Sequence, residues 1–381
     1  MIDYFTILTI MNRFNKSLFD IPVSEQNKYL LSFSEPQDNL ERSYFQYKCQ
    51  IFFSSKLLIL AQNLVAILLF PLVALFLLLK KNPQKKSQHE IVISIDGIAV
   101  NVIPKELKGQ FFRFSEGNVL RFKDVVFCCK SLIRYPFSPF FSFKLMFNVS
   151  KYRYVIDCYN PRQIVVHSEF SFCSSALTLF CNMHDIQHVN MMHGEKLFYI
   201  RDSFFRFDKC FVWDPHYIYL FSQLRAYLGQ FIVSVPDSLY INTMIYEDIN
   251  KHVDYKYYLA NQTEIELTQI VKSMLLLESY GFSILIRPHP RYTNMNILQK
   301  LIAKDKIESN ADVSIEDSLS NCGNIISCYS TVLLQGLTID KQIIIDDISN
   351  SNLYLKLKDM QFIALSKEFK FLSDIVRQTK I

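Results

Sequence analysis

Two apolar runs that each end abruptly in polar residues constrain the fold of this chain most strongly. Residues 284–291 read Ile-Leu-Ile-Arg-Pro-His-Pro-Arg, and residues 325–337 read Ile-Ile-Ser-Cys-Tyr-Ser-Thr-Val-Leu-Leu-Gln-Gly-Leu. A short apolar run with a polar end is typical of a buried strand in a parallel sheet. Because ligands bind at the carboxyl edge of open α/β sheets, the two polar ends are expected to share a binding site there.

Apolar runs and helical segments alternate along the chain, which predicts an α/β fold with helices on both faces of parallel sheets. The second half should contain strands and helices in turn, at residues 256–260, 263–280, 283–287, 294–303, 324–328, 331–338 and 342–345. The first half should contain strands at residues 90–96, 125–129, 154–157, 163–167, 189–192 and 209–212, with a helix at 171–183. Gly281 is a plausible end for the helix at 263–280.

The length of 381 residues is enough for two ordinary domains. We expect two Rossmann-like domains that face one another across a cleft, with the junction between them near residues 236–254. The expected divisions are an N-terminal preface, an acceptor domain, a nucleotide-sugar domain and a C-terminal amphipathic helix, at residues 1–88, 89–245, 253–366 and 367–381.

Residues 57–79 contain no charged side chain, and are interrupted only by Gln62, Asn63 and Pro71. That length of apolar chain is sufficient to cross a bilayer. Four lysines, at positions 80, 81, 85 and 86, follow directly and place the downstream chain on the cytoplasmic side. The segment either spans the membrane or lies in its interface beneath the catalytic body, and a buried core helix is the third alternative. We expect membrane attachment, with the topology open.

Composition sets broader limits on the class of protein. Half of the residues are hydrophobic and 20% are charged, which indicates a globular chain. The net charge of +5 is spread out, and no basic tract carries interleaved aromatic residues, so a nucleic-acid partner is not expected. Nine cysteines without a C-x-x-C pair are typical of buried thiols in a reducing cytosol. The start Met-Ile-Asp lacks the basic region of a cleavable signal peptide.

The first polar strand end offers two guanidinium groups and an imidazole. Proline on each side of His289 stops the strand and fixes an extended turn, while Arg287 and Arg291 provide forked donors for an anion. The alternative is an ordinary basic surface loop. Arginine, histidine and a nearby helix start suit a phosphate or a phosphate-linked sugar.

The second polar strand end places Ser330 and Thr331 where a helix is expected to begin. Their hydroxyls and the first free backbone N–H groups of that helix would face outward together. The alternative is that these residues only cap the helix, a role that Ser and Thr often have. Their position, on the strand-to-helix turn next to that of His289, favours a role in binding.

Together these motifs resemble the C-terminal half of bacterial surface-polysaccharide glycosyltransferases of the GT-B fold. The resemblance covers residues 255–346: a strand ending in Arg-x-His-Pro, the acidic pair Glu316 and Asp317, then a strand and a helix led by Ser and Thr. Sialyltransferases and polysialyltransferases use equivalent motifs to hold the phosphate of CMP-sialic acid, and enzymes that transfer polyol phosphate from CDP-glycerol share a similar pattern. The resemblance implies that His289, Ser330 and Thr331 contact the donor phosphate, and that the final helix packs against the N-terminal domain.

The related enzymes also carry an acidic motif ending in glycine, whose carboxylate deprotonates the acceptor hydroxyl. Asp96-Gly97 is the nearest match in this chain, but it lies early in the first half. His193-Gly194-Glu195, directly after an expected strand, is the better placed candidate. Glycosyl transfer needs a base near the acceptor oxygen, so His193 or Glu195 is the expected base. A core histidine at a strand end is the alternative.

A metal ion is not expected at the active site. His184 and His188 are one helical turn apart, as in zinc proteases, but the residue after His184 is an aspartate and a strand follows at once. Asp346 and Asp347 after a strand suit an acidic turn better than a divalent ion. Arginine, histidine and a helix N-terminus stabilise a phosphate without a metal, and displacement at an anomeric carbon requires no redox cofactor.

The sequence therefore predicts an inverting glycosyltransferase that uses a nucleotide-sugar donor, with CMP-sialic acid as one possibility. Its expected acceptor is a lipid-linked glycan in capsule or O-antigen synthesis, at the cytoplasmic face of the inner membrane. Transfer of a polyol phosphate from a CDP donor is the first alternative. A zinc-dependent membrane hydrolase and a non-catalytic membrane assembly protein are the others.

Overall fold

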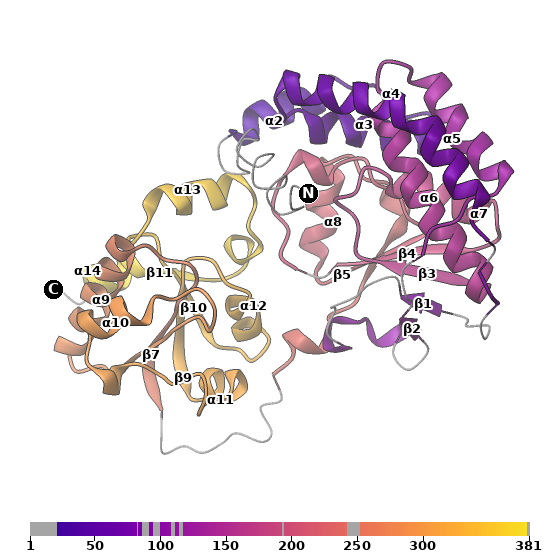
Figure 1. The fold of residues 1–381 in the computed structure, drawn as a ribbon. Helices are drawn as coiled ribbons and strands as arrows, with labels where there is room; N and C mark the ends of the chain where they lie inside the picture. The colour runs from indigo at the N-terminus through magenta and orange to yellow at the C-terminus, as the bar shows by residue number, and fades with distance from the viewer. Residues whose placement is uncertain are drawn as a thin grey trace. The chain divides into compact units, whose positions relative to one another are not determined.

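The computed structural model describes residues 21–81, 83–85, 91–93, 100–107, 111–113, 117–192, 194–241 and 252–378. The chain divides into two compact units (Figure 1). The first comprises residues 1–194 and 198–236, and the second comprises residues 195–197 and 237–381. Helices that precede the first sheet belong to the first unit.

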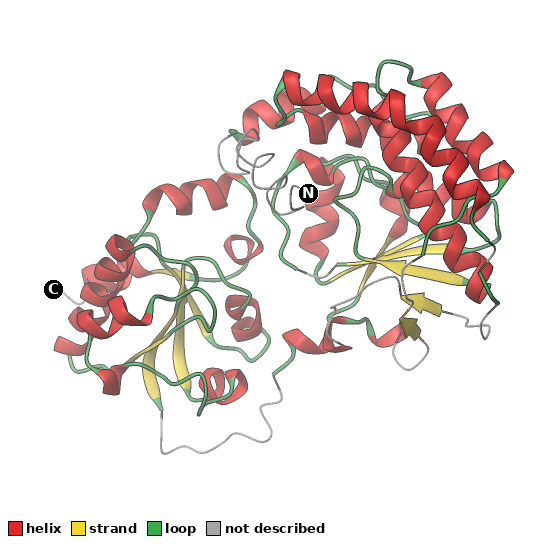
Figure 2. Ribbon diagram, viewed as in Figure 1, coloured by secondary structure: helices red, strands yellow, loops and turns green. Residues whose placement is uncertain are grey.

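The described part of the first unit contains a six-stranded parallel sheet with the order β2-β1-β3-β4-β5-β6. Its strands are β1 (Ile91–Ile93), β2 (Phe111–Arg113), β3 (Gln163–Val166), β4 (Gln187–Met191), β5 (Lys209–Val212) and β6 (Phe231–Val233). Its helices are α2 (Val23–Leu30), α3 (Asn39–Ile51), α4 (Lys56–Leu79), α5 (Phe122–Arg134), α6 (Pro139–Tyr159), α7 (Ser174–Asn182) and α8 (Pro215–Gln223). Strands and helices are separated by colour in Figure 2.

Side chains alternate between the two faces of this sheet, as strand geometry requires. Val165, Val189 and Phe211 form one core with residues of two short 3₁₀ turns, at Val100–Val102 and Lys105–Leu107. On the other face His188 of β4 contacts α6 and α7. Helices α4 and α5 then pack on α6, and α3 packs on α7, so the helices form two layers over that face.

The described part of the second unit contains a five-stranded parallel sheet with the order β11-β10-β9-β7-β8. Its strands are β7 (Val253–Tyr258), β8 (Ile284–Arg287), β9 (Cys322–Ser327), β10 (Gln342–Ile345) and β11 (Lys370–Phe371). Its helices are α9 (Glu264–Ser279), α10 (Met295–Leu301), α11 (Ile315–Ser320), α12 (Val332–Leu337), α13 (Ser351–Asp359) and α14 (Leu372–Gln378). Both units are thus α/β with parallel strands, as the sequence predicts.

The helices of the second unit cover both faces of its sheet. Ile326 and Ile344 face a core that also contains Leu267 and Met274 of α9 and Leu372 of α14. The neighbouring strand residues point the other way, toward α12. A side chain at Gly336 of α12 would lie only 2.4 Å from Ile325 and 2.9 Å from Ile343, so glycine lets this helix approach the sheet closely.

The strand order reverses between β7 and β9, which are neighbours in the sheet although β8 separates them in sequence. From β7 the chain passes through α9 to β8 at one edge, whereas from β9 it passes through α12 to β10 in the opposite direction. The turns after β7 and β9 therefore diverge, which leaves a crevice at their carboxyl ends.

Two strand predictions in the first half are wrong. Residues 125–129 lie in α5 and residues 154–157 lie in α6. In α5 the buried residues are Asp124, Phe127, Cys128 and Ser131, a spacing of three and four that belongs to a helix. A five-residue apolar run is too short to separate this period from that of a strand.

The prediction for the C-terminal segment is also partly wrong. Lys370 and Phe371 form the edge strand β11 beside β10, and the described helix α14 begins only at Leu372. This helix packs against α9 in its own unit, with Ile375 and Val376 beside the core. Its apolar face covers the sheet of the second unit.

Candidate functional site

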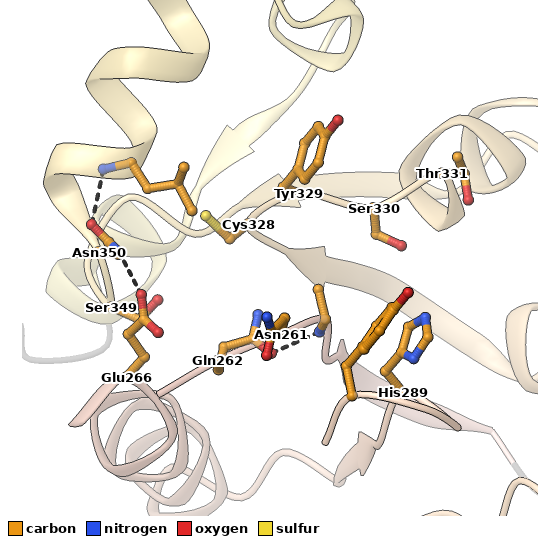
Figure 3. A pocket seen from close by; sticks show the side chains of 13 residues that line it. Asn261, Gln262, Glu266, His289, Cys328, Tyr329, Ser330, Thr331, Ser349 and Asn350 are labelled. Atoms are coloured by element: carbon orange, nitrogen blue, oxygen red, sulfur yellow. Dashed lines mark hydrogen bonds between the residues drawn. The ribbon is translucent and has the colours of Figure 1, made fainter. Parts of the chain in front are cut away.

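A pocket of about 340 Å³ lies at the carboxyl ends of four strands of the second unit (Figure 3). Residues 260–262 follow β7, His289 and Tyr292 follow β8, residues 328–331 follow β9, and residues 349, 350 and 353 follow β10. The pocket therefore occupies the crevice where the strand order reverses. Its volume is within the range of about 300–1,000 Å³ that is usual for small-molecule sites.

His289 and Ser330 lie on one side of this pocket, and Glu266, Ser349 and Asn350 lie on the other (Figure 3). The structure thus brings together His289, Ser330 and Thr331, which are about forty residues apart in sequence but line the same cavity. Tyr292, Tyr329, Glu266 and Asn350 also line it, although no motif in the sequence marks them.

The turn that carries His289 is held by hydrogen bonds at several points. The backbone N–H of His289 donates to Thr293 Oγ1 at 2.7 Å, and Asn310 Nδ2 donates to the carbonyl of Pro288 at 2.8 Å. The His289 ring stacks on Tyr292, with centroids 4.5 Å apart and planes inclined by 28°. The imidazole is therefore set at a defined angle before any ligand binds.

These contacts also fix the tautomer of His289. Its Nδ1 accepts a hydrogen bond from the backbone N–H of Arg291 at 3.1 Å. In the neutral ring the proton must then be on Nε2, which becomes the donor. Partial burial and the nearby Arg291 charge both lower the pKa of His289, so the neutral form prevails at pH 7.

Ser330 is prepared to donate in a similar way. Its Oγ accepts a hydrogen bond from the backbone N–H of Val332 at 3.2 Å, which leaves the hydroxyl proton available. Thr331 occupies the N-cap position of α12 without a side-chain capping bond, and this residue also lines the pocket. The neutral His289 ring and these two hydroxyls together form a set of donors that suits an anionic ligand.

The opposite wall is organised by carboxylates. Glu266 belongs to the capping box of α9, where it accepts from the backbone N–H and hydroxyl of Thr263, and it also accepts from Asn350 Nδ2. Asp346, at the end of β10, accepts from the backbone N–H groups of Ile348 and Ser349, both at 2.9 Å. These bonds hold the turn that carries Ser349 and Asn350, so Asp346 acts here as a turn residue.

The two arginines of the first motif are placed differently from His289. Neither is among the residues that line the pocket. Arg287 is buried, with Nη1 donating to Glu308 Oε2 at 2.6 Å and Nη2 donating to the carbonyl of Val313 at 2.9 Å. Arg291 is exposed, and its backbone rather than its guanidinium contacts His289.

Glu308 is the centre of a buried charge cluster. It also accepts from Lys256 Nζ at 2.5 Å and from the Ser318 hydroxyl, and Lys256 is only 1% exposed. Burial alone would raise the pKa of Glu308, but the adjacent Lys256 and the hydrogen bonds from Lys256, Ser318 and Arg287 lower it overall. The cluster ties β7, β8 and the segment before β9 together beneath the site.

None of the other predicted site residues that the structure describes lines the pocket. His193 and Asp96 lie outside the described residues. Glu195 is grouped with the second unit, where its charge, together with burial, raises the pKa of Tyr329 to about 12. Glu316 and Asp317 are in the first turn of α11, and Asp317 accepts from the Ser314 hydroxyl that caps this helix. Neither lines the pocket.

The histidines of the zinc hypothesis are His188, in the core of the first unit, and His184, which is only partly buried. His188 is fully buried, with its ring nitrogens 2.7 Å from the Tyr152 hydroxyl and 2.8 Å from Thr178 Oγ1, and burial lowers its pKa to about 3. His184 lies beyond the end of α7 and contacts the Phe180 carbonyl and Arg153. Within the described ranges, no group of three His, Cys, Asp or Glu residues is placed to hold a metal ion.

Comparisons with known proteins give distant likenesses. No family model matches the chain, and no curated protein matches it in sequence. Among solved structures, it is similar to UDP-GlcNAc 2-epimerase from Neisseria meningitidis bound to UDP-GlcNAc (10% identity, TM-score 0.43, 77% of this chain and 91% of that one). It is also similar to the glycotransferase of kitacinnamycin, with 8% identity and a TM-score of 0.43 over 78% of this chain and 90% of that one. The wall teichoic acid polymerase TagF matches with 8% identity and a TM-score of 0.39 over 86% of this chain and 89% of that one. Likenesses at this level do not assign a function.

Proposed function

We propose that this chain is a glycosyltransferase whose second unit binds the phosphate of a nucleotide-activated donor. The observation that carries the proposal is the convergence of His289, Ser330 and Thr331 on one pocket at the carboxyl ends of β7, β8, β9 and β10. Each of these residues presents a neutral donor, and the crevice where strand order reverses is where open α/β sheets bind nucleotides. Such donors stabilise the charge that develops on a leaving phosphate.

The two tyrosines favour a nucleotide over a free phosphate or a simple sugar phosphate. Tyr292 and Tyr329 line the pocket and offer aromatic surface to a flat ligand. Glu266, held by Thr263 and Asn350, supplies the one carboxylate of the pocket lining. A carboxylate suits a ligand part that is rich in hydroxyl groups and is separate from the phosphate.

The base is assigned by the chemistry of the reaction. In this proposal Glu195 or His193 removes the proton of the acceptor hydroxyl, and the hydroxyl oxygen displaces the nucleotide phosphate at the anomeric carbon with inversion. The influence of Glu195 on the pKa of Tyr329 supports a location of this carboxylate near the pocket. Hydrogen bonds from His289 and Ser330 stabilise the charge on the leaving group, so the proposed mechanism needs no metal.

The donor and acceptor follow from the sequence resemblance. The proposed reaction transfers a sugar, with CMP-sialic acid as a first candidate donor, to a glycan of a capsule or O-antigen. A lipid-linked acceptor at the cytoplasmic face of the inner membrane is consistent with the exposed apolar helix α4. Transfer of a polyol phosphate from a CDP donor would use the same phosphate contacts.

A donor screen tests the proposal. The purified chain would be incubated with CMP-sialic acid, CDP-glycerol and UDP-sugars, and nucleotide release and product would be followed by mass spectrometry. We expect one donor to be consumed by the wild type and not by His289→Ala, with both proteins equally folded by circular dichroism. Unchanged turnover in His289→Ala would refute the assignment of the phosphate site. Consumption of CDP-glycerol alone would identify the reaction as polyol phosphate transfer.

A further inference from the structure

Helix α4 exposes apolar side chains over most of its circumference. Only Ala66, Phe70, Ala74 and Leu77 are buried, and they form one narrow stripe against α6. Eleven large apolar side chains are exposed, namely Leu57, Leu60, Leu64, Val65, Ile67, Leu68, Leu69, Leu72, Leu75, Phe76 and Leu79. Among the described residues α4 is the one helix long and apolar enough to cross a membrane. An apolar surface of this extent requires an occupant.

Both ends of α4 are tied to the body of the first unit. Near its start, Asn63 Oδ1 accepts from the backbone N–H of Phe140 at 3.1 Å, at the beginning of α6. Near its end, the Leu77 carbonyl accepts from the backbone N–H of Leu120 at 3.2 Å, and Val119 in turn bonds to Ser150 of α6. The helix therefore lies lengthwise along α6.

The elements before and after α4 belong to the same unit. Helix α3 precedes it and packs on α7, where Ser43 Oγ accepts from the backbone N–H of Ala176 at 2.8 Å and Gln46 donates to the Glu169 carbonyl at 2.7 Å. The sheet strands follow it. A helix that crosses a bilayer puts its two flanks on opposite sides of about 30 Å of hydrocarbon. That separation would break the contacts of α3 with α7 and the hydrogen bond of Leu120 with Leu77.

Helix α5 adds basic groups to the outward side of α6. Its exposed face alternates apolar and basic residues: Phe122, Lys123, Val126, Lys130 and Ile133. Lys80, Lys81 and Lys85 are exposed directly after α4. Tyr152 of α6 contacts His188 of β4, so this side of α6 faces the sheet. Helices α4 and α5 therefore cover the opposite side of α6. Lysines beside a wide apolar surface complement anionic headgroups above acyl chains, rather than the apolar face of another protein.

We propose that α4 is a membrane-interface helix that lies in the plane of an anionic bilayer and does not cross it, with α5 supplying basic and apolar contacts beside it. The exposed side of α4 enters the acyl region, and its buried stripe keeps the first unit attached. Lysines 80, 81 and 85 contact lipid phosphates. The chain would then reach a membrane-embedded acceptor from one side only.

Vesicle co-sedimentation of the full chain tests the partner. The chain should bind phosphatidylglycerol-containing vesicles more strongly than phosphatidylcholine alone, and Lys80→Gln/Lys81→Gln should remove that preference. Leu68→Glu/Leu72→Glu, at positions 70% and 63% exposed, should weaken binding about tenfold or more. The matched control Ile265→Glu/Leu355→Glu, at positions 76% and 55% exposed in the second unit, should bind like the wild type. Thermal unfolding and nucleotide binding report separately on folding and on the donor site.

Several outcomes would overturn the proposal. Unweakened vesicle binding by Leu68→Glu/Leu72→Glu would exclude α4 as the contact, and equal binding to phosphatidylcholine would exclude the anionic partner. A wild-type dimer that the same substitutions dissociate, with no vesicle binding, would show that a second copy covers this face.

Site-specific labelling tests the orientation. Cysteines introduced as Lys56→Cys, at the first residue of α4, and as Gln84→Cys, beyond its end, should both react with an impermeant maleimide added outside sealed vesicles, above the wild-type background. If one of the two reacted only after detergent, the helix would cross the bilayer and the in-plane orientation would be wrong.

Discussion

Removal of the His289 imidazole is the sharpest test of the donor site. Its Nδ1 is occupied by the backbone N–H of Arg291, so Nε2–H is the single hydrogen-bond donor that the neutral ring offers to a ligand. A hydrogen bond to a charged group contributes about 1.5–3 kcal/mol, which is roughly ten- to 150-fold in affinity. Because the ring is only partly buried, we expect the lower end, about tenfold weaker nucleotide binding in His289→Ala.

Two further substitutions separate the donor from the ring. His289→Phe keeps an aromatic ring beside Tyr292 but has no donor, whereas His289→Gln restores an N–H near the position of Nε2. We expect His289→Phe to lose as much affinity as His289→Ala, and His289→Gln to recover part of it. Isothermal titration with CMP, CDP and UDP measures the affinities, and urea unfolding confirms equal stability. Affinities within twofold of the wild type for His289→Phe would refute the reasoning.

The pH dependence gives an independent check on the same group. In the free protein, partial burial and Arg291 lower the pKa of His289, and a bound phosphate would raise it. At a pH between the pKa of His289 in the free protein and its pKa in the complex, binding takes up a proton, so affinity rises as pH falls. For a phosphodiester donor, which does not titrate in this range, we expect tighter binding at about pH 6 than at about pH 8. The slope should vanish in His289→Gln, and a persistent slope would assign the proton to another group.

Three further predictions concern the site and its support. Ser330→Ala should weaken nucleotide binding about fivefold, the effect of about 1 kcal/mol from one hydroxyl donor, by isothermal titration. Glu308→Gln should destabilise the fold by about 3 kcal/mol in urea unfolding, because Lys256 and Arg287 would remain buried without a carboxylate. His188 has a pKa of about 3 in the folded protein, against 6.5 for an ordinary histidine. The stability that the neutral ring contributes is therefore complete above pH 6.5 and is lost as the pH falls. We expect stability to fall by up to about 1.4 kcal/mol per pH unit below that point, and a smaller slope in His188→Gln.

The second half of the chain was predictable because its strands are buried on both faces. Such strands appear in the sequence as continuous apolar runs, and the strand predicted at residues 342–345 coincides with β10. The prediction at 283–287 begins one residue before β8 and ends with it, and the prediction at 324–328 begins two residues after the start of β9 and ends one residue after its end. The same strand-end rule also finds the missed pocket residues Asn261, Gln262 and Asn350, which lie in the turns after β7 and β10.

The first half was less predictable because helices are packed in two layers there. Helix α6 lies between the sheet side and the outer helices, so Val149, Tyr152, Val155, Ile156 and Tyr159 are all buried. A helix that is buried on several sides shows little amphipathic period, and a short window of it is indistinguishable from a strand. The short strands β2 and β6, of three residues each, carry too little pattern to be recognised.

Arg287 shows where reasoning from the sequence ends. It stands at the end of an apolar run, two residues before His289, and its charge alone suggests an anionic ligand. Its actual partner, Glu308, is 21 residues away and is shared with Lys256, 52 residues before it. Nothing local encodes that pairing, since it depends on which strands become neighbours. Yet the pairing explains why a buried charge is tolerated here: the Glu308 carboxylate accepts hydrogen bonds from two cations, Lys256 and Arg287, and from the Ser318 hydroxyl beneath the pocket. Arg287 therefore serves the site by fixing the strand end from which the His289 turn projects.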